Sequence, residues 1–300
     1  MRNKFLMMSN WMLPTRALIF SALFSLSSFL QADALLLSLQ GVPAPGALLI
    51  GRAVPGVDVL LGDSLLTQTP DGHFVLGFGR DESGRKALTL RGKDQYGNRQ
   101  EETHEFVLRA REWRMQRVEG VPQETVTPPP ERLERIRKEG ALVAAARRVS
   151  SSRRDFLTPF VWPATGPITG VYGSQRVYNG EPKNPHYGVD IAGPKGAPVI
   201  APAGGKVTLV HPDMFYSGGT LLIDHGYGIS STFIHLSKVL VKEGQEVKRG
   251  ELVGEIGASG RATGPHLDWR MNWFKERLDP QWFMSGEDLQ AVQAGRPAGR

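Results

Sequence analysis

The sequence contains no cysteine among its 300 residues. This absence excludes disulfide bonds, zinc sites built on cysteine, thiol catalysis and a lipid-modified cysteine. A large excess of one charge is also missing, because 36 basic and 30 acidic side chains give a net charge of +6. With 40% hydrophobic residues, this balance excludes collagen-like, coiled-coil and wholly disordered chains. The length predicts about two domains.

Long hydrophobic runs are scarce as well. The run at residues 17–30 is too short for the roughly 20 residues that span a bilayer. Basic residues precede it and Ala32-Asp33-Ala34 follows it, which is typical of a secretory signal, residues 1–34, cleaved after Ala34. A single membrane anchor is the alternative. We therefore expect secretion across the inner membrane, a periplasmic location and no stable membrane insertion after cleavage.

Residues 35–110 contain short apolar runs separated by turn clusters. Two such clusters are Pro70-Asp71-Gly72 and Tyr96-Gly97-Asn98. Apolar runs at this spacing are typical of an antiparallel sandwich. We expect a small immunoglobulin-like β-sandwich domain here.

Residues 111–156 differ in character and predict a basic linker with one helix over 131–148. Its apolar residues have helical spacing, and we expect this helix to pack on one of the two domains. The apolar residues are Leu133, Ile136, Leu142 and Val143. From Arg109 to Arg154 there are 12 basic and 6 acidic residues. A nucleic-acid arm is one explanation, but aromatic residues are not interleaved and export is expected, so we predict no nucleic-acid partner. A solvated helix face or attraction to an anionic wall polymer explains the charge as well.

Residues 157–284 are dense in glycine and proline and carry short strand-like runs. They predict a second all-β domain, followed by a tail at 285–300. Five of the seven histidines lie in this region.

The candidate chemistry in this region lies in two short patterns, His186-x-x-x-Asp190 and His266-x-Asp268. Alternate residues on a strand project to one face, so His266 and Asp268 can point toward one metal ion or one water molecule. Imidazole and carboxylate groups are suitable zinc ligands. On spacing alone, a metal site and separate structural histidines both remain open.

The sequence around these residues identifies a protein family more specifically than their spacing does. Six segments in order resemble the lysostaphin-type (LytM-type) zinc metallo-endopeptidases, which hydrolyse peptidoglycan. The segments are NPHYGVDIA (184–192), GAPVIAPAGGKV (196–207), IDHGYG (223–228), FIHLS (233–237), GQEV (244–247) and GASGRATGPHL (257–267). Six motifs over about 120 residues are far more specific than one pattern.

The resemblance implies a barrel-like β-fold, the duplicated hybrid motif, in an enzyme that hydrolyses amide bonds in peptidoglycan stem peptides or crosslinks. It implies one Zn²⁺ per chain, with His186 and Asp190 as ligands. It also implies that His235 and His266 are catalytic, as general base and as stabiliser of the tetrahedral oxyanion, on a water that the metal activates. His225 corresponds to a structural position.

Asp268 departs from the family pattern, in which a histidine is the third ligand. Aspartate binds zinc at a similar distance, so a site of His186, Asp190 and Asp268 remains chemically sound. A second carboxylate makes the site more anionic, and another divalent metal is an alternative. The other outcome is a catalytically inactive protein that binds peptidoglycan or activates another cell-wall hydrolase.

Residues beside the motifs predict a peptide-binding groove. Gly188 suits a close approach of an extended peptide. Tyr187, Arg261 and Arg270 are candidates to contact substrate carboxylates, with a solvated surface position as the alternative. Trp269 either lines the groove or packs in the core.

Overall fold

The computed structural model describes residues 34–94 and 96–284, and this part of the chain is mostly β, as predicted. The expected signal segment, apart from Ala34, and the expected tail at 285–300 lie outside the described residues. No helix in the described part has both the length and the apolar character needed to cross a membrane.

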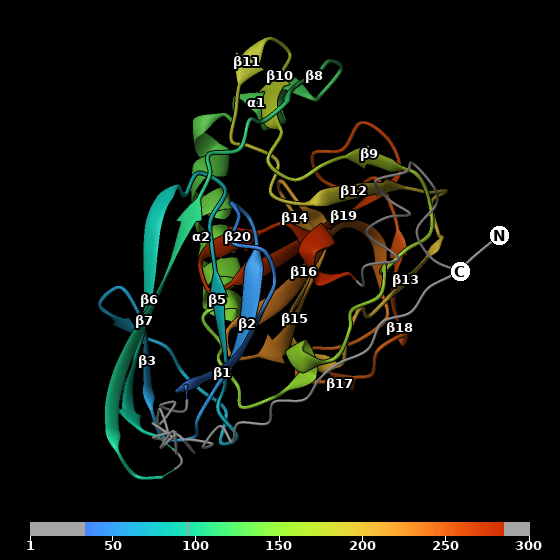
Figure 1. The fold of residues 1–300 in the computed structure, drawn as a ribbon. Coiled ribbons are helices and arrows are strands. Elements are labelled where there is room, and N and C mark those ends of the chain that lie inside the picture. The colour runs from blue at the N-terminus through green and yellow to red at the C-terminus, as the bar shows by residue number, and fades with distance from the viewer. Residues whose placement is uncertain (1–33, 95, 285–300) are drawn as a thin grey trace, which may run out of the picture. The chain divides into compact units, whose positions relative to one another are not determined.

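Two antiparallel sheets form the N-terminal part of the chain (Figure 1). The strands of the first, in order, are β1 (Leu36–Gln40), β2 (Leu48–Ala53) and β5 (His73–Gly77). Those of the second are β4 (Ser64–Leu65), β3 (Asp58–Leu61), β6 (Gly84–Lys93) and β7 (Arg99–Leu108). Leu49 and Leu76 from one sheet share a hydrophobic cluster with Leu88 and Leu90 from the other. The immunoglobulin-like topology stays a prediction.

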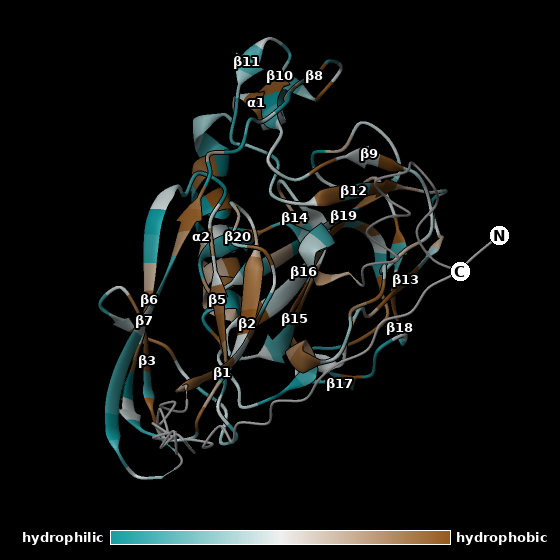
Figure 2. Cartoon of the chain, viewed as in Figure 1, coloured by the Kyte–Doolittle hydropathy of each residue, from teal (hydrophilic) through white to brown (hydrophobic). Residues whose placement is uncertain are grey.

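Burial alternates along β7, as expected for a strand with one face turned toward solvent. Exposed residues alternate with partly buried residues along β7, and Figure 2 shows hydrophilic colour over β6 and β7 and hydrophobic colour on β2.

The segment expected to be a linker contains more structure than one helix. Its elements are β8 (Met115–Val118), α1 (Gln123–Val126), α2 (Pro130–Arg147) and the 3-10 turn η1 (Asp155–Leu157). Strand β8 pairs in parallel with β10 (Gln175–Tyr178), which pairs in turn with β11 (Glu181–Pro182). The pairing of β8 with β10 joins residues about 60 positions apart, so no local sequence pattern predicts it.

Helix α2 occupies the span predicted for it, beginning at Pro130, where the missing N–H of proline is not needed. Its expected apolar contact is wrong in part, because Leu133 and Leu142 are each 47% exposed. Val143 contacts a small cluster on the neighbouring strands, but the best buried side chains of the helix include Glu139 and Arg147. These make polar contacts with the sheet, so the helix docks through hydrogen bonds as well as apolar burial.

The C-terminal part forms a ten-stranded sheet around the largest hydrophobic core. The path of strands is β17 (Glu246–Val247), β14 (Gly205–Met214), β15 (Gly218–Gly226), β16 (Ile229–Val239), β19 (His266–Trp273), β12 (Val189–Ala192) and β9 (Ile168–Gly170). Beside this path lie β13 (Pro198–Ile200), β18 (Leu252–Ile256) and β20 (Glu276–Leu278), and the 3-10 turn η2 (Pro280–Phe283) follows. Leu221, Phe233 and Trp269 are completely buried in this core.

The N-terminal sheets contact the large sheet directly. Leu48 and Val75 belong to the core cluster of the large sheet. The backbone N–H of Asp279 donates to Gly46 O at 2.8 Å, and Arg80 Nε donates to Gly173 O at 2.8 Å. The two parts therefore share a packed boundary, while the division at residues 110 and 157 stays a prediction.

We expect Gly77→Val to destabilise the protein through this boundary. A Cβ atom at Gly77 would lie 3.0 Å from Leu278 Cδ2 and 3.2 Å from Trp273 Cε3, so the larger side chain overpacks the contact. The expected loss is about 1–3 kcal/mol of unfolding free energy, measured by urea denaturation.

Gly140→Ala is the control, because no atom lies within 4 Å of a Cβ at this exposed position of α2. This substitution should raise stability by up to about 1 kcal/mol. An unchanged urea midpoint for Gly77→Val would contradict the packed boundary.

Candidate metal centre and groove

The centre of the site is a pair of aspartates on neighbouring strands. In the antiparallel pairing of β12 with β19, Asp190 lies directly opposite Asp268. Directly opposite residues on one face have Cβ atoms about 5 Å apart, so the register alone brings the two carboxylates together. Each aspartate is at least 93% buried.

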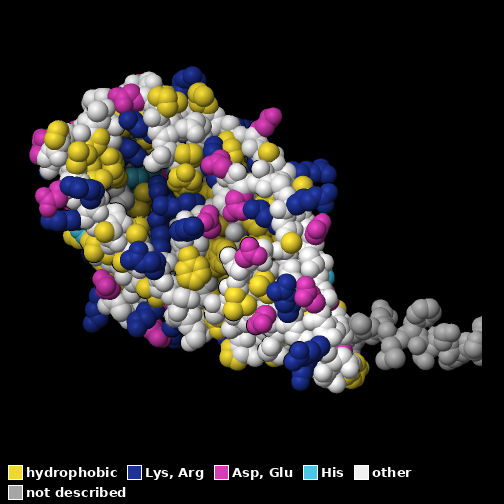
Figure 3. Space-filling view, turned by 90° about the vertical axis from the view of Figure 1, so that its left-hand side faces the viewer, with side chains coloured by type: hydrophobic (Ala, Val, Ile, Leu, Met, Phe, Trp, Pro, Cys, Tyr) yellow, Lys and Arg dark blue, Asp and Glu magenta, His cyan; other side chains and the backbone are white. Residues whose placement is uncertain are grey.

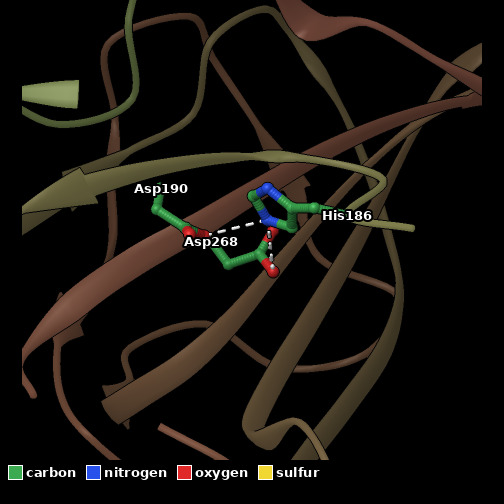
Figure 4. A group of neighbouring side chains, drawn as sticks. All are labelled: His186, Asp190 and Asp268. Carbon is green, nitrogen blue, oxygen red and sulfur yellow. Dashed lines mark ion pairs between the residues drawn. The ribbon is translucent and has the colours of Figure 1, made fainter. Parts of the chain in front are cut away.

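His186 reaches the same point from the loop before β12. Its Nε2 atom lies 3.0 Å from Asp190 Oδ1 and 3.2 Å from Asp268 Oδ2 (Figure 4). Its Nδ1 atom lies 3.2 Å from the carbonyl oxygen of Val171 and must donate to it. In the neutral ring the lone pair is therefore on Nε2, which is buried and in this form meets no hydrogen-bond donor within residues 34–94 and 96–284.

This geometry fits a divalent metal ion. The three ligand atoms lie within 4.8 Å of one another. Ligand atoms of a tetrahedral zinc ion, at about 2.0–2.1 Å from the metal, are roughly 3.3 Å apart, close to both distances from His186 Nε2. A bare lone pair that faces two carboxylate oxygens is unfavourable, and either a proton on Nε2 or a metal ion between the groups removes this repulsion. His186, Asp190 and Asp268 are thus suited to hold the ion that the resemblance implies.

Each carboxylate also has its own arginine. Arg176 Nη2 donates to Asp190 Oδ2 at 2.7 Å. Arg270 binds Asp268 with two hydrogen bonds, Nε to Oδ1 at 3.0 Å and Nη2 to Oδ2 at 2.6 Å. The expectation of a more anionic site is therefore incomplete, because Arg270 offsets the charge that Asp268 adds. A solvated position for Arg270 is also wrong, since it forms a bidentate pair inside the groove.

Arg176 is a site residue that the sequence interpretation missed. It lies 14 positions before Asp190, on β10, which is not part of the large sheet. A buried carboxylate needs a cationic partner. A search for basic residues near Asp190 in the sequence could therefore have found Arg176.

The arginines and His186 keep both carboxylates ionised. Burial by itself would raise the pKa of Asp190, but the charge of His186, in the protonated form that the two carboxylates favour, and that of Arg176 lower it. Burial likewise would raise the pKa of Asp268, but Arg270 and then His186 hold it well below its usual range. Ionised carboxylates are the form that binds a metal ion.

Two glycines make room for the carboxylates. A Cβ atom at Gly170 would lie 2.0 Å from Asp190 Oδ2, and one at Gly188 would lie 2.2 Å from Asp268 Oδ1. Any larger residue would push the aspartates out of place. The expected role of Gly188 beside a bound peptide is therefore wrong, because this buried glycine lies against Asp268.

His235 and His266 lie together beside the aspartates, with ring centroids 4.8 Å apart. His235 Nδ1 donates to the Ser259 carbonyl at 2.7 Å, and His266 Nδ1 donates to the Gly264 carbonyl at 2.8 Å. The Nε2 atoms are thus free for chemistry, and that of His266 is 3.8 Å from Asp190 Oδ1. Burial lowers the pKa of His235 to about 4, so its ring is neutral at pH 7.

The backbone of His235 has a φ angle of 65°, in the left-handed region that non-glycine residues rarely adopt. Its N–H donates to Ser217 O at 2.8 Å, which holds this conformation within β16. Strained backbone of this kind is concentrated at functional sites.

His225 takes no part in the cluster, in agreement with its expected structural position. It is completely buried, and its Nδ1 and Nε2 atoms contact Gly204 O at 2.6 Å and Ser231 Oγ at 2.7 Å. Burial lowers its pKa to about 4. Trp269 is completely buried too, so of its two expected positions the core is the observed one.

A groove of about 990 Å³ opens over these residues. The five charged or catalytic candidates of the sequence analysis line it together, namely His186, Asp190, His235, His266 and Asp268. The segment after β7 contributes a wall that the sequence did not predict, since Val118, Val121 and Val126 line the groove as well.

Comparisons with known proteins agree with this arrangement. The model of peptidase family M23 matches residues 184–280. A crystal structure from Pseudomonas aeruginosa, of a protein assigned to peptidase M23, is 30% identical, with an alignment that covers 81% of this chain and 95% of that chain at a TM-score of 0.59. A β-rich fold with a buried histidine and two carboxylates indicates the metallopeptidase class. The chain belongs to peptidase family M23, and the resemblance to lysostaphin-type enzymes is confirmed.

Curated relatives match about a third of this chain. Peptidoglycan DD-endopeptidase ShyB of Vibrio cholerae is 47% identical over 89 residues, which are 29% of this chain and 20% of ShyB. A lipoprotein NlpD/LppB homolog of Pseudomonas aeruginosa is 35% identical over 101 residues, which are 34% of this chain and 32% of that protein. The match thus spans a fifth to a third of the length of these two relatives.

We expect Asp268→Ala to lower the unfolding free energy by about 3 kcal/mol, because it leaves the guanidinium of Arg270 half-buried without its partner. Urea denaturation with a chelator present measures this loss without a contribution from metal binding. The double variant Asp268→Ala/Arg270→Met should recover most of the loss.

The matched control is Glu105→Ala. Glu105 pairs with Arg85 at 3.2 Å, but these side chains are 60% and 78% exposed, so the expected effect is within about 1 kcal/mol. Equal losses of unfolding free energy for Asp268→Ala and Glu105→Ala would show that the buried pair of Asp268 stabilises the protein no more than an exposed pair does.

The depressed pKa of His225 predicts a pH-dependent stability. The neutral ring is favoured in the folded state, so its contribution is complete above the unfolded pKa of 6.5 and is lost as the pH falls toward 4. The loss at full protonation is at most about 3 kcal/mol. Thermal unfolding between pH 4 and 7.5 measures it, and His225→Gln should flatten this dependence.

His104→Gln is the control for this series, because His104 is 40% exposed and lies far along the chain from the large sheet. Parallel pH curves for the wild type and His225→Gln would contradict the assignment.

Proposed function

We propose that this protein is a secreted, metal-dependent endopeptidase that hydrolyses amide bonds in peptidoglycan stem peptides or crosslinks. One observation carries the proposal: three buried ligand atoms, from His186, Asp190 and Asp268, converge beside the free Nε2 atoms of His235 and His266. Convergence of a ligand set with a pair of potential proton acceptors in one groove is what amide hydrolysis requires.

In this proposal Zn²⁺ or another divalent ion, when bound, supplies a Lewis acid that polarises the scissile carbonyl. His235 Nε2, on a ring held by the Ser259 carbonyl, accepts the proton of the attacking water and afterwards donates it to the leaving nitrogen. His266, fixed by the Gly264 carbonyl, lies beside His235 in the groove, where it is assigned to stabilise the developing oxyanion. Arg176 and Arg270 keep the two aspartates oriented toward His186.

The substrate class is supported by the name of one relative, Peptidoglycan DD-endopeptidase ShyB, and by family membership. Residues 1–34 support export to the periplasm on sequence grounds alone. The sheets of residues 35–110 form a packed neighbour of the large sheet, and we propose that this domain positions the groove on the wall.

A second function is favoured by a specific observation. Arg176 and Arg270 already pair with the two aspartates, and a proton on His186 Nε2 can bond both carboxylates where a metal ion would otherwise lie, so the three side chains are compatible with a metal-free groove. The alternative is therefore a peptidoglycan-binding protein that activates another cell-wall hydrolase and cuts nothing itself. One matching relative carries the name of a lipoprotein and not of a peptidase.

Metal content and digestion of purified sacculi, measured on the same sample, separate these functions. We expect about one metal ion per chain and released muropeptides for the wild type, and neither for His186→Ala. His235→Gln should keep the metal but lose at least about 100-fold in cleavage rate, as expected for a lost general base. His211→Gln, in the same domain but outside the groove, is the control.

Cleavage by His186→Ala at the wild-type rate would overturn the metal-dependent mechanism. Sacculi that are bound but not cut, with no metal retained, would support the hydrolase-activating alternative.

A further inference from the structure

The groove carries more positive charge than its own carboxylates neutralise. Among the residues that line it, the basic ones are Arg176, Lys183, Arg261, Arg270 and Arg277, and the acidic ones are Asp190 and Asp268. The space-filling view shows Lys and Arg side chains gathered in a hollow (Figure 3). Both aspartates are already paired, and Lys183 pairs with Glu181 at 2.8 Å. Within the described ranges, Arg261 and Arg277 have no carboxylate at ion-pair distance.

Arg261 is held rigidly but its charge is not neutralised. Its guanidinium lies over two rings, 4.8 Å from the centroid of Tyr178 and 4.7 Å from that of Tyr216. One N–H group, on Nη1, donates to the carbonyl of Thr125 at 3.2 Å. Stacking leaves the edge of a guanidinium, with its remaining donors, available to a ligand. Little side-chain entropy remains to be lost on binding.

Arg277, on β20, is the second such cation. Its guanidinium lies over the ring of Tyr187 at 5.5 Å, and its Nη1 atom is buried without a hydrogen-bond partner among the described residues. Burial, together with the charge of Arg270, lowers the pKa of Arg277 to about 10, so the surroundings disfavour its charged form. An unpaired buried donor on a cation is costly unless an anion binds to it.

A further guanidinium strengthens the positive potential. Arg147 from α2 is buried with its Nη2 atom 3.2 Å from Thr232 Oγ1, and no carboxylate of the described chain lies at ion-pair distance from it. Its charge acts on the same region as that of Arg270 and Arg277. A groove with several cations in low-dielectric surroundings attracts anions over long distances.

We infer that Arg261 and Arg277 are carboxylate-binding positions of the groove and that its preferred ligand is a peptide with free carboxylate groups. The planar guanidinium matches a carboxylate with two parallel hydrogen bonds, and the flanking tyrosine rings fix its orientation. The inference rests on the proposed function only in taking the ligand to be a peptide. It assigns to Arg261 and Arg277 the selection of the ligand, separate from the residues that do the chemistry.

Fluorescence anisotropy with dye-labelled synthetic peptides tests this inference. The probe is a pentapeptide with one glutamate and a free C-terminus, compared with its C-terminal amide, its glutamine analogue and the doubly neutral peptide. The wild type should bind the diacid at least about 10-fold more tightly than the doubly neutral peptide, which corresponds to about 1.4 kcal/mol. The two singly neutral peptides show whether a side-chain or a terminal carboxylate is bound.

Arg261→Gln and Arg277→Gln should each weaken binding of the diacid about 10-fold and leave binding of the doubly neutral peptide unchanged. Arg132→Gln is the matched control, because it removes the same charge from an exposed position of α2. Arg277→Lys should give an intermediate affinity, since it keeps the charge but loses the planar fork. Thermal unfolding of each variant checks that it is folded.

Equal affinity of the wild type for the diacid and the doubly neutral peptide would overturn the inference and needs no variant. Wild-type affinity of Arg261→Gln and Arg277→Gln for the diacid would overturn it too. Failure of the proposed function is a separate result: carboxylate-selective binding without cleavage of sacculi supports this inference and contradicts the peptidase. Cleavage of sacculi without carboxylate-selective binding supports the peptidase and contradicts this inference.

Discussion

Asp190 and Asp268 face each other across two neighbouring strands, and this juxtaposition constrains the rest of the site. Two ionised carboxylates at such a distance, nearly removed from water, repel each other unless cations surround them. Arg176 and Arg270 supply two of these cations, and His186 presents a lone pair toward the space between the oxygens, where a metal ion fits. The glycines beside the aspartates are required because a Cβ atom would displace the carboxylates.

Arg270, on β19, compensates for the presence of Asp268 where the family pattern has a histidine. Aspartate in place of a neutral histidine adds one negative charge, and the bidentate pair with Arg270 removes it. Asp268 and Arg270 therefore behave as one unit within a single strand, two positions apart. The same positive charge that protects the aspartates extends along the groove, so metal binding and attraction of an anionic ligand depend on one electrostatic arrangement.

The wall of the groove couples the N-terminal part to the site. Strand β8 adds to β10 and lines the groove with Val118, and the segment that follows β8 lines it with Val121 and Val126. The carbonyl of Thr125 in the same segment accepts a hydrogen bond from Arg261. Because the N-terminal sheets also pack on the large core, the connecting segment is held at both ends. Contacts that hold this segment in place therefore also hold the wall of the groove in place.

The sequence by itself determined the β character of residues 157–284, the helix after Pro130 and the three motifs that contain His186, Asp190, His235 and His266. These follow from short apolar runs at regular spacing, a helix start signal and short specific patterns, all of which are local. Only the tertiary structure decided that Arg176 and Arg270 neutralise the aspartates, that β8 joins β10 and that two arginines of the groove have no carboxylate partner in the part of the chain that the structure describes. Charge pairing and strand pairing depend on which distant residues share a buried space, and no local pattern encodes that.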